Sequence, residues 1–271
     1  KTRIKISNPL LQEISCLRNN IWQEHIKICN QNINAGRDFC WIFETGNIFL
    51  SESKDSQIEI LSGAICGNNY DEKWETSGKS NELNYYQARG KLRQVFSSLN
   101  ISVIDKPTEK YKFLHPGRTS ILIIEGKEAG YFGEINPKDI SEKKIIKNLY
   151  LFSVDIDKLI NASIRANKWT PLFKEYPLVP KIERDINFIF DRKYLVSEIL
   201  QSVKKFGKNI LEEVKLIDIY NDGNLEKNLI SYTFRLSFRD KEKTLVEKDV
   251  AEINDYIIKN IEKRYTAKLK I

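Results

Sequence analysis

The chain has 271 residues, and 44 Lys and Arg against 37 Asp and Glu give it a net charge of +7. Hydrophobic residues make up 41% and charged residues 30%, ordinary values for a folded globular protein that exclude a disordered, collagen-like or coiled-coil chain. The mild positive charge permits a polyanionic partner without requiring one.

The first part of the chain is predicted to combine a few helices with many strands. The expected elements are a helix over about 13–34, a buried strand pair over 39–50, a strand over 58–67, a helix over 83–99, and strands at 101–105, 119–125, 129–134 and 150–156. Most of these strands are joined by short turns. They therefore favour an antiparallel sheet in an α+β layer over a doubly wound parallel sheet.

Three prolines, Pro171, Pro177 and Pro180, lie within ten residues and mark a seam that neither a helix nor a central strand can cross. We place a domain boundary near 172, which gives domains over 1–172 and 173–271. The second domain is predicted to contain a strand over 185–190, a helix over 195–206, strands over 213–220 and 229–238, a helix over 249–264 and a strand over 267–271. This βαββαβ order is that of the split ferredoxin-like fold.

Four cysteines, Cys16, Cys29, Cys40 and Cys66, include no CxxC pair, so their spacing encodes neither a zinc ribbon nor a redox dithiol. We expect them to be reduced and buried, and we expect no metal site. No apolar run approaches the roughly 18 residues of a membrane span, and no signal peptide opens the chain. We therefore expect the protein to lie in a reducing interior compartment and to have no membrane partner. The sequence contains no Met, which indicates a fragment or a processed chain.

Several short strings occur in an order that resembles one known family. In the first part these are Asn8-Pro9-Leu10, Ser15-Cys16-Leu17-Arg18, Asn32-Ile33-Asn34, Phe43-Glu44-Thr45-Gly46, His115-Pro116-Gly117-Arg118 and Gly133-Glu134-Ile135-Asn136-Pro137. In the second they are Tyr176-Pro177, Arg184-Asp185, Leu216-Ile217-Asp218-Ile219-Tyr220 and Lys243-Thr244-Leu245. Together they are similar to the beta chain of bacterial-type phenylalanyl-tRNA synthetase.

The resemblance implies a class II synthetase-like antiparallel sheet domain without catalytic residues, followed by a ferredoxin-fold anticodon-binding domain. It also implies the absence of earlier domains, including those associated with editing. The expected partners are a catalytic alpha chain, in a complex of two alpha and two beta chains, and phenylalanine tRNA. ATP and Mg²⁺ would be used by the whole enzyme and not bound by this chain alone.

Few residues of the first domain are candidates for chemistry. Neither of the ATP-binding arginines of class II enzymes is recognisable, and no Gly-rich phosphate loop is present. The cluster His115-Pro116-Gly117-Arg118 pairs a titratable ring with a guanidinium. We favour a Pro-Gly turn before the strand at 119, with Arg118 holding a loop or a subunit interface. We expect His25 to have a structural role at the surface or in the core, without a part in chemistry.

The strongest candidate site lies on the strand over 214–220. Period-two alternation places Ile217 and Ile219 on one face and Leu216, Asp218 and Tyr220 on the other. If the helices cover the isoleucines, Asp218 and Tyr220 lie on or beside the open face. A ring can stack on an unpaired guanine while a carboxylate accepts hydrogen bonds from the edge of that base. The resemblance assigns anticodon binding to Asp218 and Tyr220; the alternative is that Asp218 caps the turn at 221–223 and Tyr220 packs.

Other residues are expected to shape or support the RNA surface. Tyr232, Phe234, Leu236 and Phe238 form an apolar stripe that is predicted to be core. Possible phosphate contacts are Arg235, Arg239, Lys204, Lys205 and Lys208, since such contacts position RNA without reading its sequence.

The rival hypothesis is a stand-alone RNA-binding or structural module that has no synthetase partner. The abundance of Ile, Lys and Asn indicates an A/T-rich genome. The expected compartment is the chloroplast stroma, with the bacterial cytoplasm as the alternative.

Overall fold

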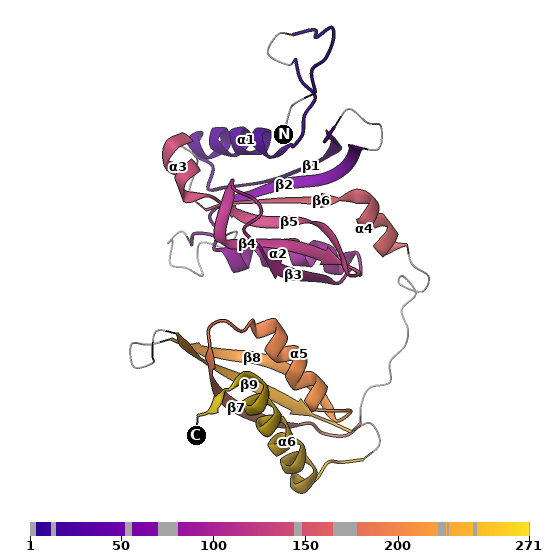
Figure 1. The fold of residues 1–271 in the computed structure, drawn as a ribbon, viewed down its shortest axis with the longest axis vertical. Coiled ribbons are helices and arrows are strands. Elements are labelled where there is room, and N and C mark those ends of the chain that lie inside the picture. Colours follow the sequence, from indigo (N-terminus) through magenta and orange to yellow (C-terminus); the bar gives the residue numbers. More distant parts are fainter. Residues whose placement is uncertain are drawn as a thin grey trace. The chain divides into compact units, whose positions relative to one another are not determined.

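The computed structural model describes residues 4–11, 15–51, 56–69, 81–143, 148–164, 178–221, 226, 228–240 and 243–270. The chain divides into two compact units, Lys1–Leu172 and Phe173–Ile271 (Figure 1). Of the prolines at the expected boundary, Pro171 and Pro177 lie outside the described residues.

The first unit is built on a six-stranded sheet with the order β1-β2-β6-β5-β4-β3, in which every neighbouring pair is antiparallel. The strands are β1 (Phe39–Phe49), β2 (Gln57–Gly67), β3 (Val103–Pro107), β4 (Leu114–Ile124), β5 (Lys127–Ile135) and β6 (Leu149–Asp155). The α+β class with an antiparallel sheet is therefore confirmed.

Helices cover both faces of this sheet. On one face α2 (Tyr85–Ser98) packs Leu92 and Phe96 against Phe132 and Tyr150. On the other face α1 (Trp22–Asn34) packs against β1 and β2. The helix α2 begins at a capping box in which the side chains of Asn84 and Gln87 each accept a bond from the other's backbone N–H. Two short helices that we did not predict, α3 (Pro137–Lys143) and α4 (Ile156–Ser163), follow β5 and β6.

Three local expectations were wrong. The first helix begins at Trp22 and not near 13, because the backbone of 15–17 is extended and bonded to Ile4 and Ile6. Residues 39–49 form one long strand instead of a strand pair, since all eleven align with β2. Residues 115–118 belong to β4, with an irregularity between Leu114 and Thr119, instead of forming a separate turn before it.

The second unit has the predicted βαββαβ order. Its elements are β7 (Ile182–Asp191), α5 (Val196–Phe206), β8 (Leu211–Tyr220), β9 (Leu229–Phe238), α6 (Glu247–Tyr265) and β10 (Lys268–Leu269). The sheet order is β10-β7-β9-β8, so β8 is an edge strand beside β9.

The two helices of this unit cover one face of its sheet. Ile199 and Val203 of α5 and Ile257 and Ile261 of α6 pack against the apolar stripe of β9. That stripe is the predicted one: Tyr232, Phe234, Leu236 and Phe238 are all buried. The opposite face, which we call the open face, carries the alternate residues of each strand.

Candidate nucleic-acid interface

The strand register places Asp218 and Tyr220 on the open face. Asp218 pairs with Thr233 and Tyr220 pairs with Ser231, the β9 residues that alternate with the buried Tyr232 and Phe234. On its other side, β9 pairs with β7, where Asn187 is the partner of Thr233 and Ile189 the partner of Ser231. Asp218 and Tyr220 therefore end two neighbouring rows of residues that run across β8, β9 and β7.

The predicted alternation of strand residues 214–220 was wrong at Leu216 and at the two isoleucines. Leu216 pairs with the buried Phe234 and packs against the core, as does Val214. A β-bulge then inserts Ile217 between Leu216 and Asp218, and the bulge resets the alternation. Ile217 and Ile219 are 42% and 53% exposed instead of buried under the helices. Asp218 and Tyr220 reach the expected face because of the bulge, not because the isoleucines are core.

The carboxylate of Asp218 is exposed and has a partner in its own strand. Its Oδ1 accepts a hydrogen bond from the backbone N–H of Ile219 at 2.9 Å. This bond occupies an edge-strand donor at the bulge and fixes the carboxylate against its own strand. The alternative cap toward 221–223 involves Asp222 and Gly223, which lie outside the described residues.

The ring of Tyr220 lies beside a cation that sequence reasoning missed. Lys270 Nζ is 4.8 Å from the centroid of the ring, within the range of a cation–π interaction. Lys270 follows β10, where Leu269 packs against the core and Lys268 pairs with Ile189. Its backbone N–H donates to Asn187 O at 2.9 Å, which places Lys270 in the row of Asp218.

Between these two ends the middle of the open face is held by side-chain hydrogen bonds. Asn187 Nδ2 donates to Thr233 Oγ1 at 2.9 Å, and Ser231 Oγ donates to Asn187 Oδ1 at 2.7 Å. These bonds tie the two rows together. The surface under Asp218 and Tyr220 is therefore a fixed polar platform.

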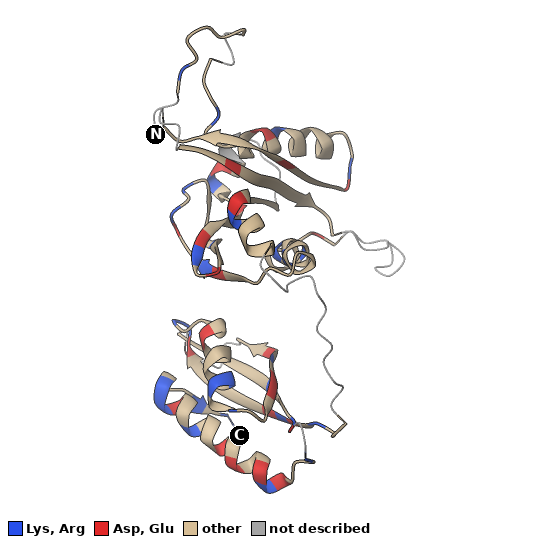
Figure 2. Cartoon of the chain, turned by 90° about the vertical axis from the view of Figure 1, so that its right-hand side faces the viewer, with Lys and Arg blue, Asp and Glu red and all other residues tan. Residues whose placement is uncertain are grey.

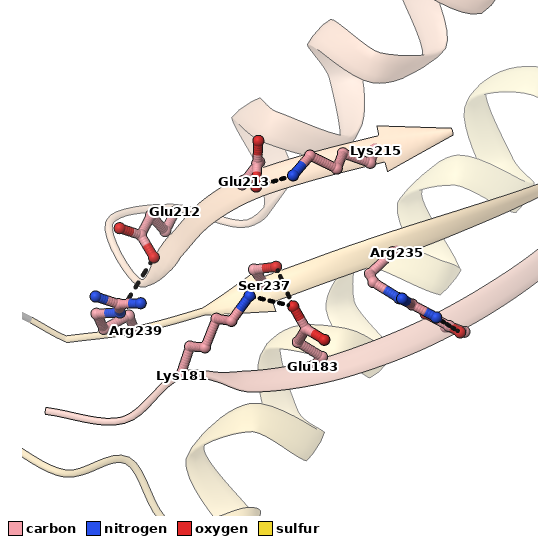
Figure 3. A network of polar contacts seen from close by, with 9 residues as sticks. Lys181, Glu183, Glu212, Glu213, Lys215, Arg235, Ser237 and Arg239 are labelled. Carbon is pink, nitrogen blue, oxygen red and sulfur yellow. Dashed lines mark hydrogen bonds and ion pairs between the residues drawn. The ribbon is translucent and has the colours of Figure 1, made fainter. Parts of the chain in front are cut away.

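Further along the sheet the open face is charged but paired (Figure 3). Arg235 binds Asp185 with two hydrogen bonds of 2.8 Å, and this contact holds the pKa of Asp185 below its usual range. Arg239 lies 3.2 Å from Glu212, the residue next to Glu213. Lys215 pairs with Glu213 at 2.8 Å. The two arginines that we expected to contact phosphates thus already have carboxylate partners.

The three expected lysine contacts lie elsewhere. Lys204 and Lys205 are in the last turn of α5, on the covered side of the sheet, and Lys208 Nζ lies 5.0 Å from the ring centroid of Tyr256 on α6. They precede the start of β8, whereas Tyr220 ends that strand, roughly 25–30 Å away at the usual rise per residue. The structure does not bring these lysines together with Asp218 and Tyr220. Acidic residues are interspersed with the cations of α5 and α6 (Figure 2).

The candidates in the first unit do not form a joint site. His115 Nδ1 accepts from the backbone N–H of Gly117 at 3.0 Å, while Arg118 reaches the buried Glu134 of β5 at 2.8 Å. Arg118 therefore links β4 to β5, whereas we had expected it to hold a loop or a subunit interface. His25 is buried in the core, and burial lowers its pKa.

Two findings concern the chain as a whole. All four cysteines are free, and Cys29, Cys40 and Cys66 are buried. Cys16 is partly exposed, contrary to our expectation, because it lies in the extended segment before α1. Across the described ranges, no helix combines the length and the apolar character that crossing a membrane requires.

Two family models match the chain. Residues 1–156 match the phenylalanyl tRNA synthetase beta chain CLM domain, and residues 177–270 match the ferredoxin-fold anticodon binding domain. The second match covers the sheet that carries Asp218, Tyr220 and Lys270.

Curated relatives agree with these models. A phenylalanine–tRNA ligase beta subunit of Prochlorococcus marinus (strain MIT 9312) is 59% identical over 100% of this chain and 33% of its own length. The subunit from Synechococcus sp. (strain CC9902) is 39% identical over 99% of this chain and 33% of its own. The chain thus spans about a third of the length of these relatives. A pyrrolysyl-tRNA synthetase structure from Desulfitobacterium hafniense is 11% identical, with a TM-score of 0.40 over 58% of this chain and 52% of its own.

Proposed function

The chain belongs to the family of phenylalanyl-tRNA synthetase beta chains, and on that premise we propose that its second unit binds the anticodon of phenylalanine tRNA through the open face. The observation that carries this proposal is the pairing of Asp218 and Tyr220 in adjacent rows, with Lys270 beside the ring. The ring of Tyr220 would stack on the first anticodon base, which is guanine in phenylalanine tRNA. The Asp218 carboxylate would accept hydrogen bonds from its N1–H and N2–H.

Lys270 extends the proposed site beyond the two residues that the sequence indicated. We propose that its ammonium group, 4.8 Å from the ring centroid of Tyr220, contacts a phosphate next to the base stacked on that ring. Phosphate contacts of this kind orient RNA without reading its sequence. Arg235 and Arg239 would present less positive charge to a phosphate, because a carboxylate partner partly neutralises each of them. Lys204, Lys205 and Lys208 would serve a separate stretch of the tRNA backbone, because they lie near the other end of β8.

We assign the first unit, which corresponds to the expected domain 1–172, to docking a catalytic alpha chain. Its arginines Arg18, Arg89 and Arg118 are each ion-paired with a carboxylate. These ion pairs partly neutralise the three guanidinium groups. We therefore propose that the alpha chain uses ATP and Mg²⁺, within a complex of two alpha and two beta chains.

The complex as a whole would attach phenylalanine to its tRNA with the use of ATP. The named relatives come from cyanobacteria, which fits both expected compartments, the plastid stroma and the bacterial cytoplasm. The family match favours this function over the rival, a stand-alone RNA-binding or structural module, which would need no alpha chain.

Co-purification with an alpha chain, followed by tRNA binding, tests the proposal. We expect a stable complex that binds phenylalanine tRNA more tightly than a tRNA whose first anticodon base is not guanine. A chain that leaves the alpha chain unbound and holds unrelated RNAs equally well would instead support the rival. ATP–pyrophosphate exchange by the beta chain alone would contradict the assignment of catalysis to the alpha chain.

A further inference from the structure

Three of the four cysteines meet inside the first unit, although they are far apart in the sequence. The sulfur atoms of Cys29, Cys40 and Cys66 all lie within 4.8 Å of one another. The three residues are 0%, 7% and 0% exposed. Their spacing in the chain matches no metal motif, so only the fold shows that they form a triangle.

Secondary structure fixes this triangle from three sides. Cys40 of β1 and Cys66 of β2 are direct cross-strand partners in an antiparallel pair. Cys29 lies on the face of α1 that packs onto these strands. The thiol of Cys66 donates to the carbonyl of Cys40 at 3.3 Å. The three thiols are therefore held together by the sheet register and by helix packing, without a flexible loop.

The size of the triangle fits a metal ion bound through sulfur. With metal–sulfur bonds of about 2.3 Å, an ion at the centre of three sulfurs holds them about 4.0 Å apart, within the observed limit of 4.8 Å. The surrounding side chains in this part of the core are apolar, with Ile26, Ala64 and Leu149 among them. His25, one helical turn before Cys29, lies outside the 4.8 Å group. The site therefore offers three sulfur ligands.

The chemistry of the donors restricts the class of ion. Thiolates select soft, thiophilic ions, of which Cu(I) and Zn(II) are the physiological examples, over Mg²⁺ or Ca²⁺. Buried thiols can also act only as small apolar side chains, but that role does not require three sulfurs to converge.

We propose that Cys29, Cys40 and Cys66 form a three-sulfur site for one soft, thiophilic metal ion. On binding, metal–sulfur bonds form, and each thiol that becomes a thiolate releases its proton to solvent. No electron is transferred. An ion bound here would join α1 to β1 and β2, and it would stabilise the folded first unit because the unfolded chain has no preformed site.

The test is a titration of the reduced full chain with Zn²⁺ and, separately, with Cu(I) under anaerobic conditions. Native mass spectrometry measures the stoichiometry. A further titration with Cd²⁺ in place of Zn²⁺ reports sulfur ligation through its charge-transfer absorbance. We expect one ion per chain for at least one of the two metals, and a thermal midpoint that rises with the first equivalent. The two arms identify which ion the site prefers.

Variants provide the controls. Cys66→Ala and Cys40→Ala should weaken binding by more than the roughly 10–100-fold that the loss of an outer-shell partner costs. Cys16→Ala is the matched control, since Cys16 lies outside the triangle, and it should bind as the wild type does. If a core variant fails to fold, the rise in the wild-type thermal midpoint remains the deciding measurement. No stoichiometric binding by the folded wild type, undiminished binding by Cys66→Ala, or an internal disulfide in the freshly isolated chain would overturn the proposal.

Discussion

The ammonium group of Lys270 lies 4.8 Å from the ring centroid of Tyr220, although fifty residues separate them in the sequence. Tyr220 ends the edge strand β8, and Lys270 follows β10 at the opposite edge of the sheet. Their side chains therefore reach toward each other across β9 and β7. This contact places a cation beside the ring that we propose to stack on an anticodon base.

Removal of the Tyr220 ring should weaken tRNA binding. We expect Tyr220→Ala to cost about 1–3 kcal/mol in affinity for phenylalanine tRNA, the usual value of stacking on one base. Tyr220→Phe should retain most of the affinity, because stacking needs the ring and not the hydroxyl. Fluorescence anisotropy with the alpha–beta complex measures both. Tyr86→Ala removes an exposed ring from α2 of the first unit and serves as the control. Unchanged binding by Tyr220→Ala would remove this residue from the site.

Asp218 should determine the preference for guanine. In the wild type, an anticodon stem-loop with inosine in place of the first guanine lacks the N2 amino donor and should bind more weakly. In Asp218→Asn the same replacement should cost much less, because hydrogen bonds to a charged acceptor contribute about 1.5–3 kcal/mol and the amide accepts less strongly. A double-mutant cycle measures this coupling. Asp255→Asn on α6 is the control, and a cycle with zero coupling would contradict the assignment.

Lys270 should contribute through charge. If its ammonium group neutralises one phosphate of the single-stranded loop, Lys270→Ala should reduce the slope of log affinity against log salt concentration by about 0.7. The affinity loss should be largest at low salt and similar for guanine and inosine loops. Lys259→Ala, an exposed lysine of α6, should leave the slope unchanged. A Lys270→Ala complex with the wild-type slope would show that this lysine only packs on Tyr220.

Stability of the first unit should fall in alkaline solution. Burial and the charge of Glu134 raise the pKa of Tyr150 to about 12, against about 10 in an unfolded chain. The folded state thus holds this proton more tightly than the unfolded chain does. The resulting contribution to the free energy of unfolding is complete below pH 10 and is lost between pH 10 and 12. The slope from this group alone is at most about 1.36 kcal/mol per pH unit. Urea unfolding across this range should show the decline.

The variant Tyr150→Phe separates this tyrosine from other groups that titrate in base. It should flatten the decline above pH 10. At neutral pH it should cost about 1–3 kcal/mol, because the hydroxyl of Tyr150 donates to the buried carbonyl of Leu83 at 3.0 Å. Tyr86→Phe is the matched control, since Tyr86 is 84% exposed. Equal slopes for wild type and Tyr150→Phe would show that burial of this hydroxyl does not govern the alkaline response.

Local sequence signals predicted most elements but few of their irregularities. The stripe Tyr232, Phe234, Leu236 and Phe238 alternates strictly, and it is core as expected. Period two also predicted a regular β8, but the bulge at Ile217 is set by pairing with β9, which no short window of sequence contains. The open-face position of Asp218 was therefore predicted correctly for an incomplete reason.

Contacts between segments that are distant in the sequence could not be predicted from it. The alternation of Lys268, Leu269 and Lys270 could have placed both lysines on one face. It could not show that Lys270 would lie beside Tyr220, because that contact depends on strand order. The cysteine triangle depends in the same way on the pairing of Cys40 with Cys66 and on the docking of α1.

The most direct measurement of the central claim is photo-crosslinking from the first anticodon base. Phenylalanine tRNA carrying 6-thioguanosine at that position would be bound to the alpha–beta complex, irradiated, and the adduct located by peptide mass spectrometry. We expect adducts in the peptide that contains Asp218 and Tyr220, with Lys270 as the second position, and their loss in Tyr220→Ala. Adducts confined to the first unit, or to α5 and α6 on the covered face, would contradict it.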